Sequence, residues 1–181
     1  GELYLGKTRL TGIDGTGIAG KRRILLNPAV EMAVLEISPD EIVATGLAFE
    51  QCDVAVVSSC SGTAPGVLGP AEAVVCRTVV DGGWLVIPGD DAEVMAMAQP
   101  FGRELAVYGS GERRAVAGRS VWQCEVDGRT VLEIVWGDAG STKTLARALC
   151  AAELAAIAAT LAAGLSLDAV DRAAVECGIV V

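Results

Sequence analysis

The feature that most constrains the fold is the alternation of short apolar runs with helical segments along the chain. Residues 53–57 (DVAVV), 84–87 and 105–108 are apolar runs of the kind found in strands buried on both faces of a sheet. Between them, residues 70–80 and 91–98 predict helices. Strands that alternate with helices favour a mostly parallel sheet flanked by helices. We therefore predict an α/β fold.

The rest of the chain adds shorter elements to this frame. Residues 116–135 alternate in two arms around Asp127-Gly128, which is typical of an antiparallel hairpin and predicts such an appendage to the sheet. An Ala-rich helix is expected over about 145–163 and a short helix over 167–176. We find no repeat and no linker composition in these 181 residues, so we predict one domain over 1–181.

Upstream, short strands are predicted at residues 3–5, 8–13 and 33–37. The last of these leads into Ser38-Pro39-Asp40-Glu41. Ser38 suits a helix N-cap, proline suits the first helical position, and Glu41 completes a capping box.

Composition excludes several classes of function. The chain has 14 basic and 23 acidic residues, and a net charge of −9 argues against nucleic-acid and anionic-membrane partners. No apolar run reaches the roughly 18–20 residues that span a bilayer. There is no histidine, which removes Ser-His-Asp and Cys-His catalysis. The six cysteines form no C-x-x-C pair and fit reduced core thiols, so we expect no zinc and a cytoplasmic protein.

Several segments, in order, resemble the Mur ligase superfamily, most of all the central domain of cyanophycin synthetases. They are residues 33–38 (AVLEIS), 46–57 (GLAFEQCDVAVV), 81–91 (DGGWLVIPGDD) and the Ala-rich tail 151–170. Such enzymes activate a carboxylate with ATP and let an amine displace the phosphate. The resemblance implies the same α/β fold. It also implies a G-T-N-G-K-T phosphate loop ahead of the region matching residues 3–26, and we expect this chain to lack that N-terminal unit.

The family's other site positions are mostly replaced here. Glu36 stands where the resemblance places a magnesium-binding glutamate, and an acidic pair is also retained at Asp90-Asp91. The replaced positions are Ser58-Ser59 for Thr-Asn, Thr63-Ala64 for Asp-His, Glu72 for the lysine, Pro88 for an asparagine, and Ala148, Leu149 and Ala152 for His-Asn-x-x-Asn. This pattern indicates a degenerate ATP site.

Two other readings of site residues stay open. A hydroxyl-rich rim of Ser58, Ser59, Ser61 and Thr63 follows a strand's carboxyl end, where open α/β sheets bind ligands.

Residues 137–144 (GDAGSTKT) nearly match a late phosphate loop, with Gly137, Gly140, Thr142, Lys143 and Thr144 as its candidate nucleotide contacts. Against that loop, Thr142 replaces the glycine before the lysine. Glu36 also fits a carboxylate that is favourable beside a helix N-terminus without a metal, and Asp90 and Asp91 also fit helix-capping roles.

The leading hypothesis is a non-catalytic domain of Mur-ligase type that acts by self-association or by binding a ligase partner, with no catalytic residues and no cofactor. The alternative is a divergent ATP-dependent amide ligase, or a fragment of one, that uses ATP and magnesium with Glu36 as a metal ligand.

Overall fold

The computed structural model describes residues 4–5, 8–9, 17–57, 69–112 and 118–179. Its internal contacts divide the chain into two units, Gly1–Gln51 and Cys52–Val181. The single domain predicted over residues 1–181 stays a prediction.

The first unit contains a minimal two-stranded sheet and two helices. Strand β1 (Tyr4–Leu5) pairs antiparallel with β2 (Thr8–Arg9), as the sequence predicted, and the helices are α1 (Gly17–Leu25) and α2 (Pro39–Thr45). The predicted strand over 33–37 is wrong, because that segment has no strand pairing and its Val34 is 92% exposed.

The start of α2 follows the predicted signals. Ser38 is its N-cap and accepts a hydrogen bond from the Glu41 N–H at 3.2 Å, and Pro39 opens the helix. The Glu41 carboxylate does not close a reciprocal capping box. It instead receives the Lys21 ammonium of α1, with Nζ 2.6 Å from each carboxylate oxygen, and this ion pair joins the two helices.

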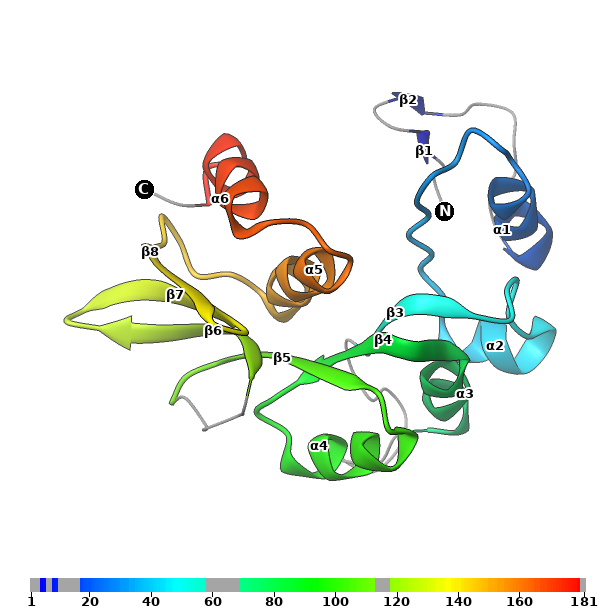
Figure 1. Cartoon of the computed structure of the whole chain (residues 1–181), viewed down its shortest axis with the longest axis horizontal. Helices are drawn as coiled ribbons and strands as arrows, with labels where there is room; N and C mark the ends of the chain where they lie inside the picture. The colour runs from blue at the N-terminus through cyan, green and yellow to red at the C-terminus, as the bar shows by residue number, and fades with distance from the viewer. Residues whose placement is uncertain (1–3, 6–7, 10–16, 58–68, 113–117, 180–181) are drawn as a thin grey trace. The chain divides into compact units, whose positions relative to one another are not determined.

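The second unit is built on a six-stranded mixed sheet in the order β3-β4-β5-β6-β7-β8 (Figure 1). The first four strands are parallel to one another, and β7 pairs antiparallel with both β6 and β8. The predicted mostly parallel α/β sheet is therefore confirmed. The strands are β3 (Cys52–Val56), β4 (Val79–Pro88), β5 (Glu104–Ser110), β6 (Arg119–Val126), β7 (Arg129–Trp136) and β8 (Ala139–Thr144).

Helices cover both faces of this sheet. Helix α5 (Ala151–Ala162) lies on one face and α3 (Pro70–Thr78) and α4 (Ala92–Ala98) lie on the other, as Figure 1 shows. The 3₁₀ turn η1 (Gln99–Phe101) follows α4, and α6 (Leu167–Glu176) ends the described chain with its predicted bounds. No helix among the described residues has the length and apolar character needed to cross a membrane.

The alternation of side chains along the strands produces two apolar layers. The layer under α5 includes Val86, Tyr108 and Leu154, and the layer under α3 and α4 includes Leu85, Ile87 and Val107. Because strand residues alternate between faces, neighbours in β4 serve different layers. The apolar runs of β4 and β5 are buried on both sides, as their continuous apolar sequence predicted, whereas β3 is only partly buried.

The hairpin between β6 and β7 confirms the turn signal. Asp127 (φ 51°) and Gly128 (φ 72°) both have positive φ, which is the conformation of a type I′ turn. The hairpin continues the main sheet, because β6 pairs in parallel with β5 and β7 pairs with β8. An aspartate tolerates this conformation better than most side chains, and glycine adopts it without steric cost.

The Ala-rich helix begins later than predicted. Residues 145–150 are not helical, because the Leu145 N–H donates to the Thr130 carbonyl and the Ala146 N–H donates to the Ile179 carbonyl. Helix α5 starts at Ala151, after Cys150 as its N-cap. Tertiary pairing with the sheet and with the end of α6 thus overrides the helix propensity of this alanine-rich stretch.

Candidate functional site

The carboxyl ends of the parallel strands are the place where an open α/β sheet binds ligands. In the second unit, this edge carries the loop that follows β4, the end of β5 and the approach to α5. The Gly89 N–H donates to the Tyr108 carbonyl at 2.8 Å, and the Tyr108 hydroxyl donates to the Val57 carbonyl at 2.9 Å. These contacts join the ends of β3, β4 and β5, so the edge is tied by hydrogen bonds between its own strands.

The aspartate pair after β4 includes a helix cap. Asp91 Oδ1 accepts a hydrogen bond from the Val94 N–H at 3.1 Å, at the first turn of α4. Asp90 beside it is exposed. The capping interpretation made from sequence is therefore confirmed for Asp91, because its side chain satisfies a backbone donor that would otherwise lack a partner.

Glu72, in the position that the resemblance gives to a lysine, lies in the first turn of α3. Its carboxylate folds back over Gly69, the residue before the helix, and leaves no room there for a Cβ atom. A carboxylate at a helix N-terminus is favoured by the helix dipole. The local structure thus accounts for this side chain without a bound ion.

The late glycine-rich segment has a different structure from the one predicted. We expected residues 137–144 to be a loop that opens a helix, and this is wrong. Gly137 (φ 63°) and Asp138 form a turn, and the remaining residues form β8, antiparallel to β7. The backbone groups of β8 that face β7 are engaged in the sheet, whereas a phosphate loop needs converging N–H groups at the start of a helix.

The candidate nucleotide contacts within this segment are spread along the strand. Gly140, Thr142 and Thr144 are exposed, and they alternate with Ser141 and Lys143. Lys143 Nζ lies 2.9 Å from the Asp171 carboxylate of α6. Nucleotide binding by this segment stays a prediction. The segment is a strand and does not open a helix, which is the geometry on which that prediction was based.

Glu36 and the hydroxyl-rich rim receive little further support. Glu36 is exposed in the first unit, two residues before the Ser38 cap. Within the described ranges, no three Cys, Asp or Glu side chains gather as a metal site would need. Glu36 as a metal ligand stays a prediction. The rim residues Ser58, Ser59, Ser61 and Thr63 lie outside the described residues.

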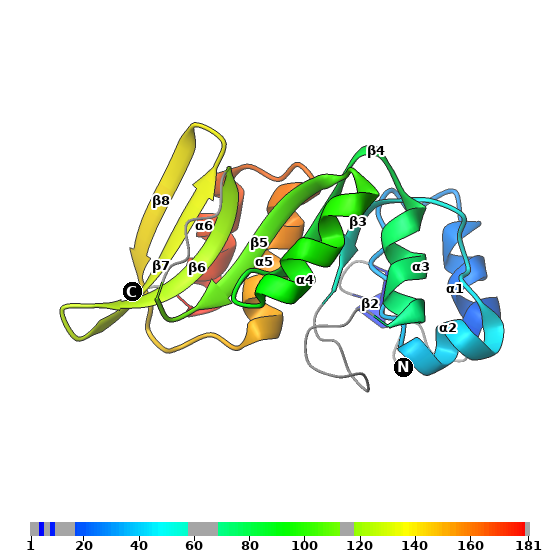
Figure 2. The same cartoon turned by 90° about the horizontal axis from the view of Figure 1, so that it is seen from below.

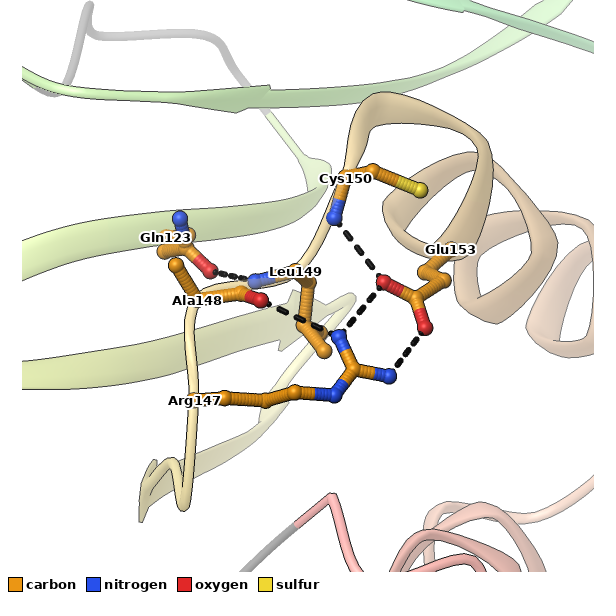
Figure 3. Close-up of polar contacts among 6 residues, drawn as sticks. All are labelled: Gln123, Arg147, Ala148, Leu149, Cys150 and Glu153. Carbon is orange, nitrogen blue, oxygen red and sulfur yellow. Dashed lines mark hydrogen bonds and ion pairs between the residues drawn. The ribbon is translucent and has the colours of Figure 1, made fainter.

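A closed polar network occupies the start of α5, where the resemblance places His-Asn-x-x-Asn (Figure 3). Gln123 of β6 accepts, through Oε1, the Leu149 N–H at 2.6 Å. Glu153 accepts, through Oε2, the Cys150 N–H at 2.9 Å and an Arg147 Nη1–H at 3.0 Å. Arg147 also donates from Nη2 to Oε1 of the same carboxylate, so the two side chains form a bidentate pair.

This network fixes the charge state of its acid. The hydrogen bonds from the Arg147 guanidinium, followed by the one from the Cys150 N–H, lower the pKa of Glu153 to about 2. Arg147 Nη1 also donates to the Ala148 carbonyl at 3.1 Å. Two of the N–H groups at the entry to α5 are therefore bonded to side chains of the same unit.

Sequence reasoning missed this network, although a signal was present. Glu153 stands three residues after Cys150, the spacing of a capping box. Cysteine is not among the preferred cap residues, and the helix start was placed six residues too early, so the spacing was not recognised.

The cysteines are less buried than expected. Of the five in the described residues, only Cys76 is fully buried, while Cys150 and Cys177 are exposed. Burial of the half-exposed Cys52 raises the pKa of its thiol, which makes the thiolate scarcer.

Comparison with known proteins identifies related sequences. Cyanophycin synthetase from Geminocystis herdmanii is 32% identical over 114 residues, which make up 59% of this chain and 13% of that protein. The enzymes of the same name from Crocosphaera subtropica and Synechocystis sp. are 32% and 31% identical over matches of the same length. The chain thus spans 13% of the length of these relatives.

Solved structures give a weaker likeness. A structure of MurF from Acinetobacter baumannii has a TM-score of 0.45 and 19% identity, covering 66% of this chain and 28% of that one. No protein-family model matches the chain.

Proposed function

From the confirmed resemblance to the Mur ligase superfamily, and within it to cyanophycin synthetase, we propose a ligase-like domain that does not bind ATP by itself. It acts through contact with a second copy or with a ligase partner. The observation that carries this proposal is the set of polar contacts at the start of α5, in which Gln123 accepts from the Leu149 N–H and Glu153 accepts from Arg147 and the Cys150 N–H.

The network bears on nucleotide binding because it engages backbone N–H groups next to the N-terminus of α5 and places a carboxylate there. The N-terminus of a helix binds anions through free N–H groups. Here the Leu149 and Cys150 N–H groups are bonded to Gln123 and Glu153. The Glu153 carboxylate also places a negative charge at this end of α5, which disfavours a polyphosphate nearby.

Two other side chains support the same conclusion. Lys143 is paired with Asp171 of α6, so its charge is partly neutralised within the second unit. Glu72 brings a negative charge to the start of α3, in the position that the resemblance gives to a lysine. Glu72 stands where a cation could stabilise phosphate, and the Lys143 cation is already paired with a carboxylate.

The edge of the sheet supports action through a partner. Among the described strands, β3 is hydrogen-bonded only to β4, so it is an edge strand. Its sequence is nevertheless apolar, with Val56 40% exposed and Asp53 as its one charged residue. An apolar edge strand without gatekeeping lysine or proline is a template for pairing with another chain.

A second candidate function is favoured by the relatives themselves. The matched proteins are synthetases by name, and the chain spans 13% of their length. A divergent ATP-dependent amide ligase, or a part of a longer one, with Glu36 and residues 137–144 at its site therefore remains the alternative proposal. It requires ATP and magnesium, whereas the first proposal requires neither.

Calorimetric titration with ATP and magnesium separates the two. We expect no ATP binding in the low micromolar range, either by the wild type or by the Arg147→Ala variant. Arg147→Ala should change only the stability of the chain. Saturable micromolar binding that Lys143→Ala abolishes would reject the first proposal and favour the ligase. Arg129→Ala, a matched loss of a basic residue at the hairpin turn, serves as the control.

Light scattering tests the contact proposal. We expect a two-fold dimer at micromolar concentration, which Val56→Lys converts to a monomer by placing a charge on the β3 edge. Val126→Lys is the matched control, since Val126 is 46% exposed at the end of β6, and it should leave the dimer intact. If the chain is a monomer, co-sedimentation with purified Synechocystis cyanophycin synthetase tests the partner. A monomer that also fails to co-sediment refutes the contact proposal.

A further inference from the structure

A hollow of about 700 Å³ opens between α3, α4 and η1 in the second unit. Helices α3 and α4 lie on the face of the sheet opposite α5, as Figure 2 shows from below. The apolar part of the lining consists of Ala73, Cys76, Ala96, Pro100 and Phe101. None of these residues belongs to the network at the start of α5.

Small side chains create the space. Ala73 of α3 and Ala96 of α4 contribute single methyl groups to the lining, and the completely buried Cys76 also lines it. Protein interiors and helix contacts are otherwise packed with few voids larger than water. A hollow of this size can hold a small organic molecule.

Two guanidinium groups complete the lining, from Arg77 and Arg103. Arg77 is exposed in the last turn of α3, and no described carboxylate forms an ion pair with it. Arg103 contacts Asp81 through one Nη, but Asp81 is 98% exposed, so water largely screens its charge. Arg103 Nε is buried and has no acceptor among the described residues.

A basic residue at the end of a helix interacts favourably with the helix dipole, which accounts for Arg77 alone. It does not account for Arg103, which lies just before β5 and lines the same space. Guanidinium groups present planar donors that match carboxylates.

We propose that this hollow binds a small organic anion, a carboxylate attached to an aromatic or branched apolar group. The carboxylate pairs with Arg77 and Arg103, and the apolar group packs on Phe101 and Pro100. This inference goes beyond the proposed function, since it concerns a different site and requires neither ATP nor a partner chain.

The test is an NMR titration of the ¹⁵N-labelled chain with benzoate, with the neutral benzamide, and with inorganic phosphate. We expect benzoate to shift the amide signals of residues 73–77 and 96–103 with saturation in the millimolar range. Benzamide and phosphate, which lack the charge and the apolar group respectively, bind more weakly. Arg77→Gln should weaken benzoate binding about tenfold, as expected for losing a charge-assisted hydrogen bond.

Three further variants make the result specific. Arg129→Gln changes the charge equally at the hairpin and should leave benzoate affinity unchanged. Ala96→Leu should fill the hollow and abolish binding while the circular dichroism spectrum stays the same, and Ala73→Leu repeats this test from α3. The proposal is overturned by the absence of saturable shifts, by equal binding of benzamide or phosphate, or by equal losses in Arg77→Gln and Arg129→Gln.

Discussion

The packing of Trp122 against Gly109 leads to a quantitative prediction. The two residues are direct cross-strand neighbours on β6 and β5. A Cβ atom on Gly109 would lie 2.5 Å from two ring carbons of Trp122. Carbon atoms in contact are normally about 3.5–4.0 Å apart, so Gly109→Ala requires a displacement of about 1 Å.

The tryptophan has little freedom to make that displacement. Its side chain is 1% exposed, and its Nε1–H donates to the Gly111 carbonyl at 3.0 Å. Overpacking of this kind costs about 1–3 kcal/mol, and the upper part of this range applies because the ring is held. Alanine recovers about 0.4–1 kcal/mol by restricting the unfolded chain. We expect a net loss of about 2 kcal/mol, or about 4–8 °C in Tm.

Urea unfolding followed by circular dichroism measures this loss, with Gly140→Ala as the matched control. Gly140 is also a strand glycine, but a Cβ there meets only the Ile134 carbonyl, at an ordinary 3.5 Å. Its φ is not in the left-handed region, so alanine can adopt the same backbone. We expect a change within about 0.5 kcal/mol for the control.

A double-mutant cycle tests the cause. Trp122→Phe removes the outer ring carbons that the new methyl group would meet, so Gly109→Ala should cost less than half as much in that background. The reasoning is refuted if Gly109→Ala is as stable as the wild type. It is equally refuted if the cost is the same with phenylalanine at position 122.

Three further predictions concern other parts of the second unit. Because the pKa of Glu153 is lowered from 4.5 to about 2, its contribution to stability is present above pH 4.5 and lost as pH falls toward 2. The stability difference between wild type and Glu153→Gln in acid urea titrations should therefore shrink over that window, and a constant difference would contradict the ion pair. Gly128→Ala should destabilise the chain by about 1 kcal/mol in thermal unfolding, since φ is 72° there, and an unchanged Tm would contradict the type I′ turn. Timed thiol labelling with mass spectrometry should modify Cys150 and Cys177 first and Cys76 last, and early labelling of Cys76 would contradict its burial.

Much of the fold could be predicted from local sequence. The turn at Asp127-Gly128, the Ser38 cap, the Asp91 cap and the bounds 167–176 of α6 all follow from interactions within a few residues. The parallel strands were recognisable because burial on both faces requires a continuous apolar run. These features depend on backbone preferences and hydrophobic patterning, which a single segment contains.

The tertiary structure alone decided the features that depend on distant partners. The segment of β8 (AGSTKT) has no strand pattern, and it is a strand because β7 offers a free edge in register. The late start of α5 likewise depends on Thr130 and Ile179, which take up the backbone groups of residues 145 and 146. The hydrogen bond between Gln123 and Leu149 joins residues 26 positions apart, and the hollow beside Arg77 is lined by residues of α3, α4 and η1, which lie apart in the sequence. Such contacts arise from the packing of the whole sheet, so no local pattern encodes them.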